Sequence, residues 1–192
     1  DWANAEDAPN PNSLEGRAAL LKQVQEIMNP VSRMEGDSLP VSVFKEHADG
    51  QFELGAAAYE KRGIAVMVPR WNDAKCIQCN QCAYVCPHAA IRPFVLTDEE
   101  VAAAPASAVF KDAVGPKAKG MKFEIAVSQF DCTGCSNCVY ICPADALTMV
   151  AAEEEQPKQE IFDYSVAHVA EKPELVANNV KGSQFKKPLL EF

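Results

Sequence analysis

The sequence predicts an α+β fold in which two copies of one supersecondary unit pack about a pseudo-two-fold axis. Three observations indicate this fold. A shift of 56 positions, which carries Cys76 onto Cys132, overlays residues 76–91 on residues 132–147. Residues 121–127 alternate apolar residues with Lys122, Glu124 and Ala126, which is the period of a half-buried strand. Residues 13–28 carry apolar side chains at helical spacing.

The N-terminal part of the chain predicts one helix and one strand. Residues 1–12 are rich in Ala, Asn, Asp and Pro, which is typical of a linker. Ser13 can cap a helix that ends before Pro30. The apolar face of this helix would contain Leu14, Ala18, Leu21 and either Val24 or Met28. Residues 64–69, IAVMVP, form a run suited to a buried strand that Pro69 would stop.

The segments that follow the two cysteine runs have weaker signals. Thr97 and Glu100 form a candidate capping box for a short helix that Pro105 would end. Residues 106–120 have the composition of a connector. After Val150 an acidic run leads into a stretch without strong periodicity. We expect this tail to lie over another surface, and a partly disordered tail is the alternative.

Composition and charge exclude several classes of protein. The chain has 192 residues, of which 48% are hydrophobic and 23% charged, and its formal net charge is -9. Nucleic-acid binders are normally basic, so that class is excluded. No apolar run approaches the roughly 20 residues that span a bilayer, and the acidic, polar N-terminus does not resemble a secretory signal. We therefore expect a cytoplasmic protein that contacts neither nucleic acid nor membrane.

The eight cysteines form two runs with the same spacing, C-x2-C-x2-C-x3-C-P. Three cysteines at steps of three let one loop wrap a 4Fe–4S cluster, and in this pattern the fourth cysteine ligates the other cluster. Two clusters with exchanged ligands must lie close together, as sequential electron transfer requires. The predicted ligands are Cys76, Cys79, Cys82 and Cys142 for cluster 1, and Cys132, Cys135, Cys138 and Cys86 for cluster 2.

Two other uses of the cysteines fit the sequence less well. Disulfide frameworks are typical of small secreted domains, and nothing here indicates secretion. Structural zinc usually takes two C-x2-C pairs that are well apart in the sequence, and a third cysteine at the next step of three fits that arrangement poorly. A zinc-stabilised interaction module is nevertheless kept as an alternative function.

The residues between the cysteines suit an iron–sulfur site. Neither run contains a charged residue between its first and last cysteine, so the loops offer small or apolar groups and free backbone N–H donors. Asn80 and Gly134 tolerate the left-handed conformation that such a loop needs. Tyr84 and Tyr140 either cover the clusters or take part in ordinary hydrophobic packing.

The cysteine repeat resembles the dicluster bacterial ferredoxins over roughly residues 74–150. The flanking stretches MEGDSLPVSVF and DGQFELGAAAYEKRGIAVMVPRW are similar to the ferredoxin-type segment of pyruvate:ferredoxin (flavodoxin) oxidoreductase. The tail NNVKGSQFKKPLLEF is similar to the stretch that leads into the last domain of that enzyme. The resemblance covers nearly the whole chain from about Val31.

The resemblance implies a dicluster bacterial-ferredoxin fold with long N- and C-terminal extensions. It implies an electron relay from thiamine diphosphate-dependent oxidative decarboxylation of pyruvate to external ferredoxin or flavodoxin. It also implies thiamine diphosphate, Mg and a third 4Fe–4S cluster elsewhere in a homodimeric parent enzyme. The sequence has neither the thiamine signature nor a ninth cysteine. We therefore expect an excised part of that enzyme, or a separately encoded subunit, that cannot oxidise pyruvate alone.

This interpretation divides the chain into four segments. They are a linker and N-terminal helix at 1–30, an extension packing on the core or the parent enzyme at 31–73, a 2x(4Fe–4S) ferredoxin-like domain at 74–150 with an insertion at about 96–120, and an extended tail at 151–192 that leads toward a missing domain.

The other alternative is a free-standing dicluster ferredoxin that shuttles electrons between unrelated enzymes, or a separate electron-transfer subunit of another oxidoreductase. A diffusible carrier, however, needs no such extensions. No catalytic residue is expected, because the sequence offers no acid–base pair and no nucleophile beside a base. His47, His88 and His168 are interpreted as packing or surface residues.

Overall fold

The computed structural model describes residues 18–173 and 175, and its contacts divide the chain into two compact units. The first unit ends at Arg62 and the second begins at Gly63. Residues 63–73, which we expected in an N-terminal extension, therefore belong with the cysteine repeats. The linker at 1–12 and the Ser13 cap lie outside the described residues. Within residues 18–173 and 175, no helix is both long and apolar enough to cross a membrane.

The first unit contains a helical stretch in three parts: α1 (Ala18–Gln23), the π-helix η2 (Val24–Met28) and α2 (Asn29–Ser32). Its buried apolar side chains are Leu20, Val24 and Ile27, whereas Ala18 and Leu21 are exposed, so the predicted apolar face was wrong at those two positions and correct at Val24. Leu14 of the predicted face lies outside the described residues. The predicted end before Pro30 was also wrong. The π-turn restarts an α-helix at Asn29, which places Pro30 in a first turn, where no backbone donor is needed.

The rest of the first unit consists of short 3-10 turns: η3 (Gly36–Ser38), η4 (Val41–His47) and η5 (Ala56–Tyr59). One buried side chain ties this chain segment to the helix, because Oε1 of Gln23 accepts the backbone N–H of Glu53 at 2.7 Å. Lys22 and Glu46 form an exposed ion pair at 3.2 Å, a kind of contact that contributes little stability.

The second unit contains two small antiparallel sheets. In one, β1 (Met67–Trp71) pairs with β5 (Leu147–Ala151). In the other, the strand order is β2 (Ile91–Leu96), β4 (Lys122–Val127) and β3 (Lys111–Asp112). Pro69 lies inside β1, opposite Met149. The expectation that Pro69 would stop the strand was therefore wrong. A two-stranded sheet leaves β1 with a free edge, where the missing N–H of a proline costs no ladder hydrogen bond.

Each sheet joins a strand beside one cysteine run to a strand beside the other run. β1 precedes the first run and pairs with β5, which follows the second run; β2 follows the first run and pairs with β4, which precedes the second. Two backbone hydrogen bonds extend this exchange: Asn72 N–H donates to Ala146 O at 2.8 Å, and Ser128 N–H donates to Ala90 O at 2.6 Å. The two repeats are therefore interleaved.

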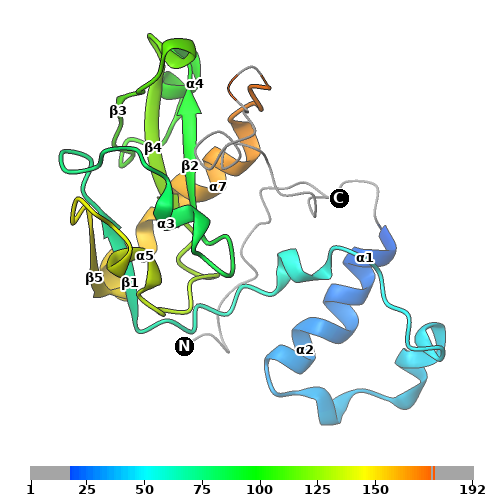
Figure 1. The fold of residues 1–192 in the computed structure, drawn as a ribbon. Helices are drawn as coiled ribbons and strands as arrows, with labels where there is room; N and C mark the ends of the chain where they lie inside the picture. The colour runs from blue at the N-terminus through cyan, green and yellow to red at the C-terminus, as the bar shows by residue number, and fades with distance from the viewer. Residues whose placement is uncertain (1–17, 174, 176–192) are drawn as a thin grey trace. The chain divides into compact units, whose positions relative to one another are not determined.

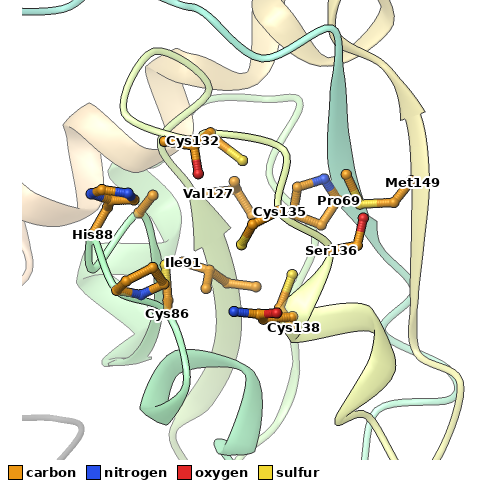
Figure 2. A pocket seen from close by; sticks show the side chains of 14 residues that line it. Pro69, Cys86, His88, Ile91, Val127, Cys132, Cys135, Ser136, Cys138 and Met149 are labelled. Atoms are coloured by element: carbon orange, nitrogen blue, oxygen red, sulfur yellow. The ribbon is translucent and has the colours of Figure 1, made fainter.

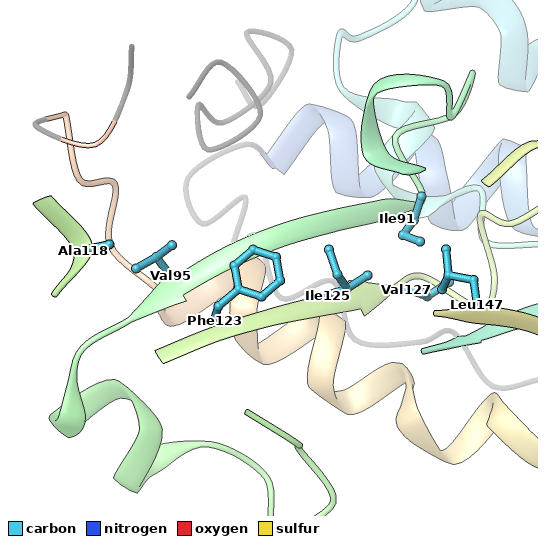
Figure 3. Close-up of a cluster of buried hydrophobic side chains, with 7 residues drawn as sticks. All are labelled: Ile91, Val95, Ala118, Phe123, Ile125, Val127 and Leu147. Atoms are coloured by element: carbon cyan, nitrogen blue, oxygen red, sulfur yellow. The ribbon is translucent and has the colours of Figure 1, made fainter. Parts of the chain in front are cut away.

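The main hydrophobic core lies on one face of β4 (Figure 3). Phe123, Ile125 and Val127 point to this face, and Phe123 is 1% exposed. Trp71 packs edge-on against Phe123, with ring centroids 6.2 Å apart. The other buried members of this core are Ile91, Val95, Ala118 and Leu147, and half-buried cysteines Cys76, Cys82, Cys86 and Cys138 pack against it.

The opposite face of β4 is covered by α7 (Gln159–His168), which lies beside this strand in Figure 1. Phe162 and Val166 of α7 pack on Ala126, and Glu124 is 2% exposed. The strand at 121–127 was thus predicted correctly, but its half-buried character was wrong. The extended tail from residue 151 was wrong for residues 152–168, which form α6 (Ala152–Glu155), η7 (Gln156–Lys158) and α7.

The segment between β2 and β4 carries α4 (Asp98–Ala103), β3 and η6 (Pro116–Ala118). The predicted capping box is confirmed, because the Thr97 hydroxyl accepts Glu100 N–H while the Glu100 carboxylate accepts Thr97 N–H. The same carboxylate accepts hydrogen bonds from Lys172 and from Ala170 N–H, so this cap also fixes the chain that follows α7.

Candidate functional site

Each cysteine run forms a tight loop that leads into one short helix. These helices are α3 (Gln81–Tyr84) and α5 (Asn137–Tyr140), and each begins at a residue in the left-handed conformation. Asn80 and Gly134 have φ of 61° and 71°, as the sequence predicted. The sequence did not predict the positive φ of Gln78, Ala89 and Ser136, because side-chain propensity disfavours it, nor that of Asp145, whose residue type tolerates it.

Backbone N–H groups are directed at cysteine sulfurs in both loops. Gln78 N–H donates to Cys76 Sγ and Gly134 N–H donates to Cys132 Sγ, each at 3.4 Å, and Ala146 N–H donates to Cys142 Sγ at 3.3 Å. Such bonds favour the thiolate form that binds iron and help to set the potential of a bound cluster. The expected amide donors are therefore present.

One pocket brings a cysteine of the first run together with three of the second (Figure 2). Cys86 lines it with Cys132, Cys135 and Cys138, the four predicted ligands of cluster 2. Its walls include the apolar residues Pro69, Ile91, Val127 and Met149 and also His88. The donor set and the apolar walls fit a 4Fe–4S cluster; the ligation itself stays a prediction.

The structure also brings together most of the predicted ligands of cluster 1. Burial raises the pKa of Cys82 to about 12, a backbone hydrogen bond at Ala83 opposes the shift, and Cys76, Cys138 and Cys79 raise it further. Cys76 and Cys82 also pack against the same core as Cys86 and Cys138. Because α3, which carries Cys82, contacts α5, which carries Cys138, the two predicted ligand sets adjoin. That Cys142 completes the first set stays a prediction.

The second set shows the same pattern. Burial raises the pKa of Cys138 to about 11, and Cys132, Cys86 and Cys135 raise it further. Burial also raises the pKa of Cys132, with Cys86 and Cys135 contributing. Iron binding must displace the protons of these thiols, because the thiolate is the ligand. Across residues 18–173 and 175, no three Cys, His, Asp or Glu side chains are grouped to hold a single metal ion.

The aromatic and histidine residues near the runs were only partly anticipated. Tyr84 and Tyr140 are 64% and 87% exposed, so ordinary hydrophobic packing was wrong for both. His88 is exposed but lines the cysteine pocket. His47 stacks on Phe52 with ring centroids 4.4 Å apart, and His168 packs near a tyrosine of α7, as expected for packing residues.

Two family models match the chain. Residues 75–146 match the 4Fe–4S dicluster domain, which agrees with the positions of both cysteine runs. Residues 11–65 match a family described as a domain of unknown function, which covers most of the first unit.

Curated relatives match the chain over its whole length. It is 47% identical to the pyruvate:ferredoxin oxidoreductase of Moorella thermoacetica and 44% identical to the pyruvate-flavodoxin oxidoreductase of Klebsiella pneumoniae, and it covers 16% of each. It is 45% identical to the mitochondrial pyruvate dehydrogenase [NADP(+)] of Euglena gracilis and covers 10% of that protein. The chain is thus homologous to one segment of the pyruvate:ferredoxin and pyruvate-flavodoxin oxidoreductases, and within it residues 75–146 form a dicluster domain for two 4Fe–4S clusters.

Proposed function

We propose that this chain is an electron-transfer module that relays electrons from thiamine diphosphate-dependent oxidation of pyruvate to external ferredoxin or flavodoxin. The pocket lined by Cys86, Cys132, Cys135 and Cys138 carries this proposal, since it joins four thiols from both repeats in an apolar setting. The relatives named above are oxidoreductases acting on pyruvate, and their names differ in the acceptor. The thiamine, its Mg and a third cluster belong to other parts of the whole enzyme in this proposal.

We further propose that the ligand sets are crossed and that the two repeats are related by a pseudo-two-fold axis. The exchanged hydrogen bonds from Asn72 to Ala146 and from Ser128 to Ala90 support the axis, because the two bonds are equivalent: the 56-residue shift carries the donor position 72 onto 128 and the acceptor position 90 onto 146. The pairing of β1 with β5 and of β2 with β4 supports it in the same way. Crossed ligation follows if Cys142 takes the place in cluster 1 that Cys86 takes in cluster 2.

The clusters supply one-electron chemistry, and the residues around them supply insulation and closeness. Ile91, Val127 and Met149 keep water from the pocket, which strengthens the effect of N–H groups on the sulfurs. The influence of Cys138 on Cys82 indicates that the two sites are near neighbours. An electron that enters one site therefore has a short path to the other.

Double cysteine variants test the crossed sets. Cys86→Ser should remove one cluster and leave about half of the iron. Adding Cys132→Ser should cause no further loss, because both cysteines serve the same cluster, whereas adding Cys76→Ser should remove the rest. Iron per chain and the spin count of the reduced protein measure the outcome. The opposite pattern, with iron lost in the Cys86/Cys132 pair and retained in the Cys86/Cys76 pair, would refute crossed ligation.

A potentiometric titration followed by electron paramagnetic resonance tests the relay itself. Two interacting reduced clusters that titrate in the lower part of the roughly -700 to +450 mV range of iron–sulfur centres would support it. A chain that binds iron but cannot be reduced in that range would contradict it.

A further inference from the structure

A carboxyl group is buried on the face of β4 that lies away from the cysteines. Glu124 is 2% exposed beneath α7, and its Oε1 accepts a hydrogen bond from the hydroxyl of Ser165. Burial raises the pKa of Glu124 to about 7, with the Ser165 hydrogen bond opposing the shift. A carboxyl in this state gains or loses its proton near neutral pH, and its Oε2 is the oxygen left to carry it.

A small pocket lies beside this carboxyl and contains two buried polar atoms without a partner. Glu124, Trp71 and Gln129 line the pocket, whose volume is about 60 Å³. Among the described residues, Trp71 Nε1 and Gln129 Oε1 have no hydrogen-bond partner, although Gln129 is only 5% exposed. Leaving a buried donor and acceptor unpaired is costly. The volume exceeds the roughly 10–15 Å³ that one water needs, so the pocket beside Glu124 can hold water.

The same pocket reaches a charged pair near the surface. Glu155 and Lys158 also line it, and they form an ion pair at 3.0 Å. The side chain of Glu155 is 4% exposed and that of Lys158 is 42% exposed, so the pair connects the pocket to solvent. Water held between this pair and Glu124 would provide a path for a proton.

The strand that carries Glu124 also borders the iron–sulfur region. Its neighbours Phe123 and Ile125 point to the opposite face of β4, into the core against which Cys76, Cys82, Cys86 and Cys138 pack. The carboxyl and the predicted ligands therefore lie on opposite sides of this strand and its core. In such a poorly solvated region, a charge added to a cluster acts strongly on the ionisation of a nearby carboxyl.

We propose that Glu124 is a proton-binding site that takes up a proton from solvent, through water held in this pocket, when the clusters are reduced. The proposal rests on the electron-transfer function proposed above. A one-electron donor reduces a cluster, an O–H bond of pocket water breaks, and a new O–H bond forms at Oε2 of Glu124. Solvent then replaces the proton that the pocket water has given up, so electron and proton charges balance.

The direction follows from the charges involved. Above about pH 7 the carboxyl is ionised. Reduction adds negative charge nearby, raises the pKa of Glu124 and favours the protonated form. The other titratable or charged groups on the elements packed around it are Lys122 on β4, Arg92 on β2, Lys111 and Asp112 on β3, Glu155 on α6, Lys158 on η7, and Glu160, Asp163, Tyr164 and His168 on α7.

Infrared difference spectroscopy of the full chain with its clusters tests the proposal at pH 8. Reduction with dithionite should produce the C=O band of a newly protonated carboxyl. Glu124→Gln should lose this band, because glutamine keeps the acceptor for Ser165 but cannot bind the proton. Glu153→Gln is the matched control, because it removes an exposed carboxyl on α6, and it should retain the band. The midpoint potential should fall as pH rises in the wild type and in the control, and the slope should vanish in Glu124→Gln.

Gln129→Leu tests the route through the pocket. Removing the unpaired acceptor should slow the shift of the carboxyl band when the buffer is changed to D₂O, without abolishing the band.

Three outcomes would overturn the proposal. Reducible clusters without the carboxyl band would refute proton uptake alone, and a band that persists in Glu124→Gln would assign it to another group. If electron paramagnetic resonance shows that the clusters cannot be reduced, the electron-transfer function and this inference are both refuted.

Discussion

The close approach of one loop to β1 allows a specific prediction about Gly134. This residue has φ of 71°, and a Cβ placed on it would lie 2.8 Å from the carbonyl oxygen of Met67. A left-handed non-glycine residue costs about 1–2 kcal/mol, and the obstacle is backbone, which cannot rotate away. Moving the loop away from Met67 would also strain the hydrogen bond that Gly134 N–H donates to Cys132 Sγ. Such a bond contributes about 0.5–1.5 kcal/mol. Gly134→Ala should therefore lower the unfolding free energy by about 2–4 kcal/mol.

Gly120 provides the matched control for this substitution. Its φ is 85°, but a Cβ there would meet nothing within 4 Å, so Gly120→Ala should cost only the backbone term of about 1–2 kcal/mol. Anaerobic denaturant unfolding followed by circular dichroism measures both variants, and the iron content after purification should fall in Gly134→Ala only. Equal destabilisation of the two variants, with iron retained in both, would refute the argument from the Met67 contact.

Two further predictions concern the core and the helix cap. Phe123→Ala should lower the unfolding free energy by about 3–5 kcal/mol, because the ring is 1% exposed. Val114→Ala, at a side chain that is 72% exposed, should change the unfolding free energy little. Similar losses in the two variants would contradict the assigned core. Burial acts to raise the pKa of Glu100, but hydrogen bonds from Lys172 and from the N–H groups of Thr97 and Ala170 outweigh it and lower the pKa from its usual 4.5. The ionised carboxyl thus contributes stability above about pH 4.5, and this stability is lost as the pH falls through the lowered pKa. Glu100→Gln should therefore lose less stability on acidification than the wild type. Parallel curves of unfolding free energy against pH for the two proteins would refute this role.

The parts of the fold that sequence patterns predicted are those determined locally. The cap at Thr97 and Glu100 depends on residues three positions apart, and the left-handed residues Asn80 and Gly134 are of types that tolerate this conformation. The spacing of the cysteines likewise anticipated which four thiols line the pocket of Figure 2.

The parts that were predicted wrongly depend on distant neighbours. Pro69 stays within β1 because, in the described part of the chain, only β5 pairs with that strand, which no local pattern reveals. Glu124 alternates with apolar residues as a surface residue would, yet α7 covers it, and the sequence of α7 has too little periodicity to predict the helix. The positive φ of Gln78 and Ser136 is imposed by the loops against their intrinsic preference.

The interleaving of the two repeats has a consequence for biosynthesis. Met67 pairs with Ala151, so Met67 of β1 is translated 84 residues (151 − 67) before its partner. At about 5–20 residues per second this delay lasts roughly 4–17 s. Cys86 likewise waits for Cys132, Cys135 and Cys138 before its pocket exists. The first four thiols are therefore translated into a chain that cannot yet enclose them, and delivery of iron to this pocket must follow synthesis of the second run.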